Sequence, residues 1–146
     1  MTGTEVCSSA LRTVIVAAGC LFESDRVLLT QRKAGAHLAG MWEFPGGKVE
    51  PGEDPRAALA RELREEIDVD ADVGNILDVT FHRYDDAEKA VLLLFYEVQR
   101  RPGSPEPRAV DVAALRWASA DEIDPSTFPP ADVAILRKID ARLRRR

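Results

Sequence analysis

The stretch from Gly46 to Val69 constrains the fold of this chain more than any other part of the sequence. It opens with a turn rich in glycine and proline, in which the backbone can adopt unusual angles and approach a ligand closely. Asp54 is a favourable N-cap and Pro55 suits the first helical position, so the sequence predicts a helix from Pro55 to about Ile67. A flexible turn therefore leads directly into a helix.

Three carboxylates share one side of this predicted helix. Glu62, Glu65 and Glu66 are separated by three and four residues, and a helix advances about 100° per residue, so the three side chains lie within about one quadrant. The neighbouring stripe is apolar and consists of Leu59, Leu63 and Ile67. Because that stripe can dock against a sheet, we expect the carboxylates at the edge of the buried surface.

Crowded carboxylates of this kind suit a divalent cation with oxygen ligands, Mg²⁺ or Mn²⁺. Between carboxylates and a polyphosphate, such an ion supports hydrolysis, and one glutamate could accept the proton of the attacking water. The alternative is a solvated acidic face on which Arg61 and Arg64 form ion pairs within the helix. Lys48, after the turn, could balance charge or simply lie on the surface.

The rest of the chain reads as one α/β domain of residues 1–146, with residues 1–10 as a loose lead-in. Strands are predicted at Thr13–Phe22, Arg26–Arg32, Trp42–Phe44, Asp72–Tyr84, Ala90–Gln99 and Leu115–Ala118. The first of these is largely apolar and is expected to be covered on both faces. A last helix is predicted over Ala131–Leu143, after a Pro-rich loop.

Composition excludes several classes of protein. The net charge of −5 argues against a nucleic-acid polymer as the main partner. Cys7 and Cys20 lack the spacing of a zinc site or a disulfide framework. The sequence shows neither a membrane-spanning apolar run nor a signal-peptide pattern, so we expect a cytoplasmic protein without a membrane partner. The oligomeric state stays open.

The spacing of the fixed residues resembles the Nudix box, G-x5-E-x7-R-E-U-x-E-E-x-G-U, where U is aliphatic. The matching residues are Gly47, Glu53, Arg61, Glu62, Leu63, Glu65, Glu66 and Val69. Only Asp68 departs, where the family has glycine. The flanking run from Gln31 to Glu50, which contains Trp42-Glu43-Phe44-Pro45-Gly46-Gly47, is similar to the MutT-type branch, as is Phe128-Pro129-Pro130-Ala131 before the last helix.

This resemblance implies an α/β/α Nudix sandwich with a mixed sheet between helices. It also implies Mg²⁺-dependent water attack on a nucleoside triphosphate, which yields a monophosphate and pyrophosphate. The resemblance assigns metal binding to the Gly46 carbonyl and to Glu62, Glu65 and Glu66. Glu62 is the preferred general base.

Other roles follow from the same resemblance. Arg61 and Glu53 would orient the loop and the carboxylates through ion pairs. Phe44 would flank the base pocket, and Arg32 and His37 would contact phosphate or nucleobase. Lys48 is assigned to substrate binding as well.

Three positions leave alternatives open. Asp68 tolerates a positive φ better than most residues, should the box require one. Asp111 stands six residues before Trp117, where the branch often has a glutamate, so it is either a metal ligand of shorter reach or a loop carboxylate. Asp124 is expected where some relatives carry an asparagine that reads oxidised guanine, and it is otherwise a loop residue.

The expected activity is removal of an oxidised or modified nucleotide such as 8-oxo-dGTP from the nucleotide pool. Hydrolysis of CTP or a modified dCTP is the alternative, because an ionised carboxylate only accepts hydrogen bonds and would suit the amine-bearing edge of cytosine. A nucleotide sensor that has lost turnover, or an enzyme for dinucleoside polyphosphates or nucleotide sugars, stays open as well.

Overall fold

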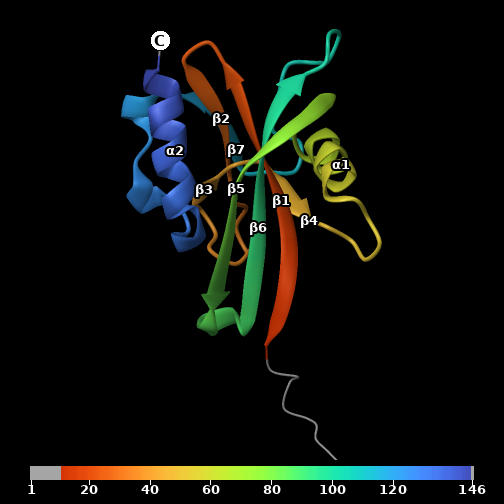
Figure 1. The fold of residues 1–146 in the computed structure, drawn as a ribbon, viewed down its shortest axis with the longest axis vertical. Helices are drawn as coiled ribbons and strands as arrows, with labels where there is room; N and C mark the ends of the chain where they lie inside the picture. Colours follow the sequence, from red (N-terminus) through yellow and green to blue (C-terminus); the bar gives the residue numbers. More distant parts are fainter. Residues whose placement is uncertain (1–10, 146) are drawn as a thin grey trace, which may run out of the picture.

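A mixed β-sheet runs through the centre of the molecule, with one α-helix on each face (Figure 1). The computed structural model describes residues 11–145. The strands are β1 (Arg12–Glu23), β2 (Arg26–Gln31), β3 (Trp42–Glu43), β4 (Gly46–Lys48), β5 (Ala71–Tyr84), β6 (Lys89–Arg100) and β7 (Ala114–Ala118). The helices are α1 (Pro55–Ile67) and α2 (Val133–Arg144). The α/β sandwich expected from the sequence is thereby confirmed.

The sheet places strands that are distant in the sequence side by side. Its order is β3-β2-β1-β6-β5, with β4 paired to β1 and β7 paired to β2. The pair β1–β6 is parallel, and the other pairs are antiparallel. Since β1 pairs with both β4 and β6, the glycine turn and the two central strands are held in one fixed register.

Several details differ from the sequence-based expectations. The glycine-rich turn includes a short strand, β4, which the sequence had not indicated, because its glycines pair with Ala17 and Ala18 of β1. The expectation that the first strand is covered on both faces is wrong for its first half: the buried run is Ala17–Leu21, whereas Arg12, Thr13 and Ile15 are exposed. The last helix begins as a 3₁₀ turn, Pro130–Asp132, before α2. The predicted lead-in 1–10 lies outside the described residues.

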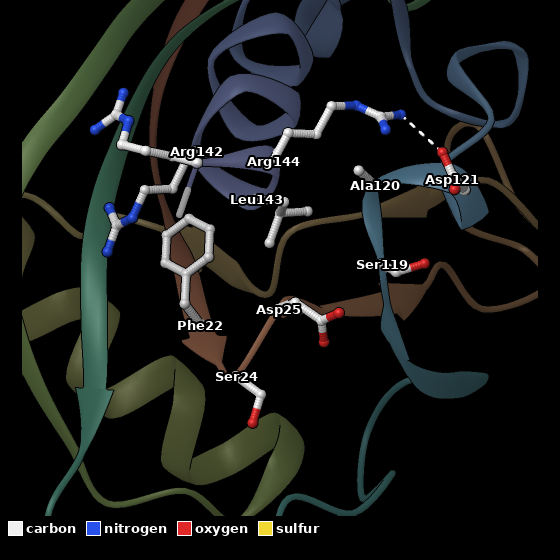
Figure 2. A pocket seen from close by; sticks show the side chains of 10 residues that line it. Phe22, Ser24, Asp25, Ser119, Ala120, Asp121, Arg142, Leu143 and Arg144 are labelled. Atoms are coloured by element: carbon white, nitrogen blue, oxygen red, sulfur yellow. Dashed lines mark hydrogen bonds and ion pairs between the residues drawn. The ribbon is translucent and has the colours of Figure 1, made fainter.

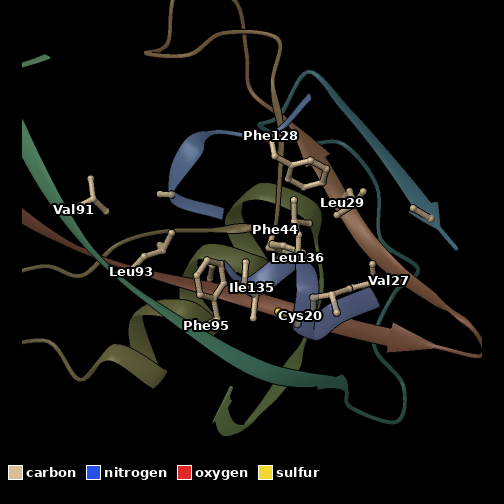
Figure 3. Packing of buried hydrophobic residues seen from close by; sticks show 14 of the residues in the cluster. Cys20, Val27, Leu29, Phe44, Val91, Leu93, Phe95, Phe128, Ile135 and Leu136 are labelled. Carbon is tan, nitrogen blue, oxygen red and sulfur yellow. The ribbon is translucent and has the colours of Figure 1, made fainter. Parts of the chain in front are cut away.

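Two apolar clusters fix the helices on the sheet. Between the sheet and α2, Phe95 packs with Phe44, and their ring centroids lie 6.0 Å apart at 87° (Figure 3). Ile135 of α2 contributes to the same cluster and is fully buried. On the other face, Leu59 and Leu63 of α1 pack against the sheet, with 0% and 1% of their surface exposed. Burial of such side chains contributes about 1.5–3 kcal/mol each, so α1 is firmly held.

The ends of α1 are capped as the sequence predicts. The Asp54 carboxylate accepts a hydrogen bond of 2.9 Å from the Arg56 N–H. Asp68 ends the helix in the left-handed region, with φ 61° and ψ 34°, and the next N–H, of Val69, bonds back to the Leu63 carbonyl at 3.2 Å. The box position that departs from the family is therefore one that requires a positive φ.

Within residues 11–145, no helix is both long and apolar enough to cross a membrane.

Candidate active site

The glycine turn and the carboxylate helix meet at Gly47 and Glu62. A Cβ atom on Gly47 would lie 2.2 Å from Glu62 Oε2 and 2.4 Å from its Cδ. Gly46 is equally confined on the other side, because a Cβ there would lie 2.0 Å from the Ala17 carbonyl oxygen. Only glycine fits between β1 and α1 at these two positions. The turn therefore brings its backbone groups directly against the carboxylates.

Arg61 links the glutamates to the turn. Its guanidinium grips Glu53 with two hydrogen bonds, Nε to Oε2 at 3.0 Å and Nη2 to Oε1 at 3.1 Å. The same group lies 3.3 Å from Glu65 and 3.6 Å from Glu62, and Nη2 donates to the Lys48 carbonyl at 3.4 Å. The structure thus places Arg61 and Glu53 where they orient the turn and the carboxylates. Their catalytic role stays a prediction.

Burial raises the pKa of two of the three glutamates. The pKa of Glu66 rises to about 8, chiefly because the group is buried and secondly because of the Glu62 charge, while a hydrogen bond from the Gly46 backbone opposes the rise. The pKa of Glu62 is also raised by burial, against the nearby Arg61. Glu65, with 57% of its side chain exposed, is the most accessible member. Crowding and burial together favour a cation between Glu62 and Glu66.

The donor set fits a hard divalent metal ion. Glu66 forms no ion pair among the described residues, so its oxygens are available, and the Glu62 carboxylate lies beside the turn. Within residues 11–145, however, no three carboxylate, imidazole or thiolate side chains converge in an arrangement ready to hold a metal ion. Binding would therefore require the glutamates to change rotamer.

Two predicted contributors lie at the rim of this cluster. Lys48 is exposed, and only its carbonyl contacts the cluster. Asp111 lies beside α1, because the N–H groups of Val110 and Asp111 both bond the Glu66 carbonyl at 3.0 Å. Its carboxylate pairs with Lys33 instead of pointing to a glutamate cluster. Metal binding by Asp111 remains a prediction that needs this pair to open.

A small cavity of about 40 Å³ lies on the other side of Gly46, between the sheet and α2. Phe44 lines it, as expected for a base pocket, and so do Leu93 and Phe95. Its polar members are Glu43 and Asp132. The cavity combines apolar walls with a few convergent polar groups, as ligand sites do, but typical ligand sites measure about 300–1,000 Å³. A nucleobase therefore fits only if the surrounding side chains move apart.

Asp132 is the pocket residue that sequence reasoning missed. It is only 3% exposed, and its pKa rises to about 8 because of burial and the Glu43 charge, although Arg32 lowers it. The available signal was the run from Phe128 to Ala131, which resembles the MutT-type branch and stops one residue short of Asp132. Glu43 was also overlooked, although it sits between Trp42 and Phe44 in the quoted motif.

Arg32 and His37 lie in the loop between β2 and β3, and Arg32 bonds Glu43, a residue that lines this cavity. Arg32 donates from Nε to the His37 carbonyl at 2.6 Å and from Nη1 to Glu43 at 2.9 Å. The His37 ring lies 2.9 Å from Asp86 and edge-on to Tyr84. The structure brings both residues to the pocket side, and their contact with substrate remains a prediction.

Asp124 is not brought to the pocket. It is exposed and caps a 3₁₀ turn, Pro125–Thr127, where its carboxylate accepts from the Ser126 N–H at 3.0 Å and from the Ser126 hydroxyl at 2.8 Å. These bonds lower its pKa. The structure therefore supplies no contact for its predicted role in reading the base.

A larger cavity, of about 490 Å³, lies elsewhere, at the C-terminal end of α2 (Figure 2). Phe22 and Arg142 form one wall, where the guanidinium carbon is 4.3 Å from the ring centroid, and Arg144 spans the opening to Asp121 at 2.9 Å. None of the predicted site residues lines it. Of its charged groups, Arg142 pairs with Glu97 and Arg144 with Asp121, whereas Asp25 and Arg145 form no ion pair among the described residues.

Residues 12–139 match the NUDIX domain family. The chain is 36% identical over 126 residues to the CTP pyrophosphohydrolase of Escherichia coli, with 86% of this chain and 90% of that protein covered. It is 32% identical over 117 residues to the 8-oxo-dGTP diphosphatase of the same organism, with coverage of 80% and 88%. The solution structure of the E. coli ORF135 protein superposes with a TM-score of 0.74 at 32% identity, with 94% of each chain covered.

The chain therefore belongs to the NUDIX domain family. It is a Nudix hydrolase of the MutT-like branch, as its sequence predicts. Members of this family generally use a divalent metal ion, in agreement with the oxygen-rich donor set described above.

Proposed function

We propose that this protein hydrolyses an oxidised or otherwise modified nucleoside triphosphate to the monophosphate and pyrophosphate, with Mg²⁺ as the preferred ion and Mn²⁺ as a substitute. Such a reaction would remove damaged nucleotides from the pool, and a cytoplasmic location would suit it. The observation that carries the proposal is the approach of Gly47 to Glu62, beside a buried Glu66 that lacks an ion-pair partner among the described residues.

The residues around the glycine turn would have three separate roles: metal binding, proton acceptance and orientation of Glu62. Bound among Glu62, Glu65, Glu66 and the Gly46 carbonyl, a divalent ion would supply charge neutralisation for the phosphate chain. Glu62 would accept the proton of the attacking water, since its oxygens lie next to the turn that faces the phosphates. Arg61 would keep Glu62 oriented through its fixed grip on Glu53.

The base would occupy the Asp132 pocket beside Phe44 after the pocket widens from its present volume of about 40 Å³. A carboxyl group with a pKa near 8 is mostly protonated at neutral pH, so Asp132 offers one O–H donor and one acceptor. That pair fits the O6 acceptor and N1–H donor of an oxidised guanine. The buried aromatic wall of Phe44 would supply apolar contact to the ring.

Cytosine is the second candidate base, and the same carboxyl favours it. Protonated Asp132 could donate to the ring nitrogen N3 and accept from the exocyclic amine, which makes CTP or a modified dCTP a matching substrate. The similarity to a CTP pyrophosphohydrolase supports this alternative.

A substrate panel tests the proposal. Pyrophosphate release is measured with Mg²⁺ for 8-oxo-dGTP, dGTP, CTP, 5-methyl-dCTP and dATP. For a dinucleoside polyphosphate and a nucleotide sugar, whose hydrolysis yields no pyrophosphate, release of the nucleotide products is measured instead. We expect the highest kcat/KM for an oxidised guanine or a cytosine nucleotide. Tight binding of these nucleotides without turnover would show that the protein is a nucleotide sensor and not an enzyme. Turnover of the dinucleoside polyphosphate or the nucleotide sugar alone would show that its substrates belong to another class.

A further inference from the structure

Three cations lie on the face of the sheet that carries the base pocket. Arg12 of β1 pairs in register with Lys89 of β6, and Lys48 of β4 pairs with Val16 of β1. Directly paired residues point to the same face, and so do residues four apart on one strand, because the side-chain period of a strand is two. Val16 lines the small cavity, so all three cations share the face that carries it.

These cations lack counter-ions among the described residues. No ion pair within residues 11–145 involves Arg12, Lys48 or Lys89, whereas the neighbouring Arg32 is neutralised by Glu43 at 2.9 Å. Asp86, a carboxylate that raises the pKa of Lys89, is engaged by His37 at 2.9 Å. The result is a concentration of positive charge on the sheet face that carries the base pocket.

The pKa of Lys89 reflects this concentration of positive charge. Its pKa is lowered first by partial burial and then by the charges of Arg32, Lys48 and Arg12, while Asp86 opposes the effect only as the smallest contribution. Like charges so close together destabilise the ligand-free protein. An anion placed among them would relieve that repulsion.

We propose that Arg12, Lys48 and Lys89 form a subsite for the terminal phosphate of a nucleoside triphosphate. The inference rests on the proposed function for the position of the rest of the substrate. With the base in the Asp132 pocket, the phosphate chain leaves past Gly46, which lines both the pocket and the carboxylate site. Lys48 follows Gly46 within β4, and Lys89 and Arg12 lie farther along the same face, about 13 Å from Val16.

The subsite has a consequence for selectivity. A triphosphate reaches the three cations, whereas a monophosphate held in the same pocket does not. The cations therefore select for the length of the phosphate chain and not for the base. They also draw polyanions to the cleft, an effect that salt weakens.

Binding of inorganic triphosphate without metal tests the subsite independently of turnover. Calorimetry compares the wild type with Lys89→Gln and Arg12→Gln, and with Arg26→Gln as the control. Arg26 is an exposed arginine at the start of β2, where it pairs in register with Glu23 at the far end of β1. We expect each cluster variant to weaken the affinity for triphosphate about tenfold, which corresponds to about 1.4 kcal/mol, and the control to change it less than twofold.

Equal losses in Arg26→Gln and Lys89→Gln, or no loss in Lys89→Gln and Arg12→Gln, would overturn the subsite. Arg12 is exposed, so its variant keeps the test open should Lys89→Gln fail to fold. A second comparison uses the nucleotides: Lys89→Gln should weaken triphosphate binding and leave monophosphate binding unchanged. If the wild type releases no pyrophosphate from any nucleotide, the proposed function fails, while the binding comparison still decides the subsite.

Discussion

The Glu62 carboxylate lies so close to the backbone of Gly47 that a Cβ on residue 47 would be 2.2 Å from Glu62 Oε2. Real Cβ atoms do not approach an oxygen this closely, so any side chain at residue 47 must displace Glu62. The glycine of the box is thus explained by contact with the glutamate and not by backbone angle, since Gly47 does not have a positive φ.

Gly47→Ala should therefore abolish most activity without unfolding the protein. A shift of about 1 Å in a catalytic group can cost about 100-fold in rate, and we expect a loss of kcat of that order. Steady-state pyrophosphate release and a thermal melt together measure it. Gly74→Ala is the control, because Gly74 lies in β5, has no positive φ, and a Cβ there would lie 3.2 Å from its nearest neighbour, the Glu97 carbonyl oxygen. If Gly47→Ala leaves kcat unchanged, displacement of the Glu62 carboxylate does not affect turnover, and the prediction is wrong.

Replacing Arg61 by lysine should separate charge from geometry. Lysine keeps the positive charge but cannot make the two parallel hydrogen bonds that Arg61 makes to Glu53 at 3.0 and 3.1 Å. We expect Arg61→Lys to lower kcat about tenfold or more, with little change in the affinity for the nucleoside monophosphate. Kinetics and equilibrium binding on the same samples measure both quantities. If Arg61→Lys keeps the full kcat, a positive charge at residue 61 is enough for turnover and the two parallel hydrogen bonds to Glu53 are not required.

Asp68 should prove to be a tolerated departure from the Nudix box. Its φ of 61° lies in the left-handed region, where aspartate is one of the few side chains accepted. We expect Asp68→Gly to change the free energy of unfolding by less than about 1 kcal/mol, because relief of strain is offset by added unfolded-state entropy. Asp68→Val should destabilise the protein by about 1–2 kcal/mol. Denaturant unfolding measures both, and higher turnover in Asp68→Gly by more than about tenfold would instead support a weakened enzyme.

The buried carboxyl of Asp132 should make stability depend on pH. Its pKa is about 8 in the folded protein and near 3.8 when unperturbed, so between these values the folded state holds a proton that the unfolded state has lost. The free energy of unfolding therefore falls as pH rises from about 4 to about 8, by up to about 5 kcal/mol from this group.

Asp132→Asn isolates that contribution, because asparagine has similar shape and does not titrate. The melting temperature of the variant minus that of the wild type should increase by several degrees between about pH 4.5 and about pH 8. A difference that is constant with pH would show that Asp132 is not protonated in the folded protein.

The catalytic half of the site could be predicted from sequence because its determinants are local. Helical spacing places Glu62, Glu65 and Glu66 on one side, and Asp54 marks where the helix begins. The contact of Gly47 with Glu62 was implicit in the box but needs β4 to pair with β1, and that pairing depends on residues 30 positions apart.

The base-binding half could not be predicted in the same way. Asp132 enters the pocket only because α2 packs on the sheet through Ile135, which buries a carboxylate that the sequence alone would place on the surface. The sequence predicts base recognition by Asp124 instead, but its carboxylate accepts local hydrogen bonds from the Ser126 N–H and hydroxyl. Neither the Lys33–Asp111 pair nor the cation cluster has a local signature, since the partners come from different strands and loops.

The most direct measurement compares pyrophosphate release by the wild type and by Glu62→Gln, with Mg²⁺ and each nucleoside triphosphate of the panel. Glu106→Gln serves as the matched control, because Glu106 is 81% exposed and pairs with Arg100 away from the site. We expect pyrophosphate and monophosphate from the wild type and the control, and a loss of kcat of about 10²–10⁴ in Glu62→Gln. Unchanged turnover in Glu62→Gln, or release of single phosphates by the wild type, would contradict the assignment of this carboxylate site.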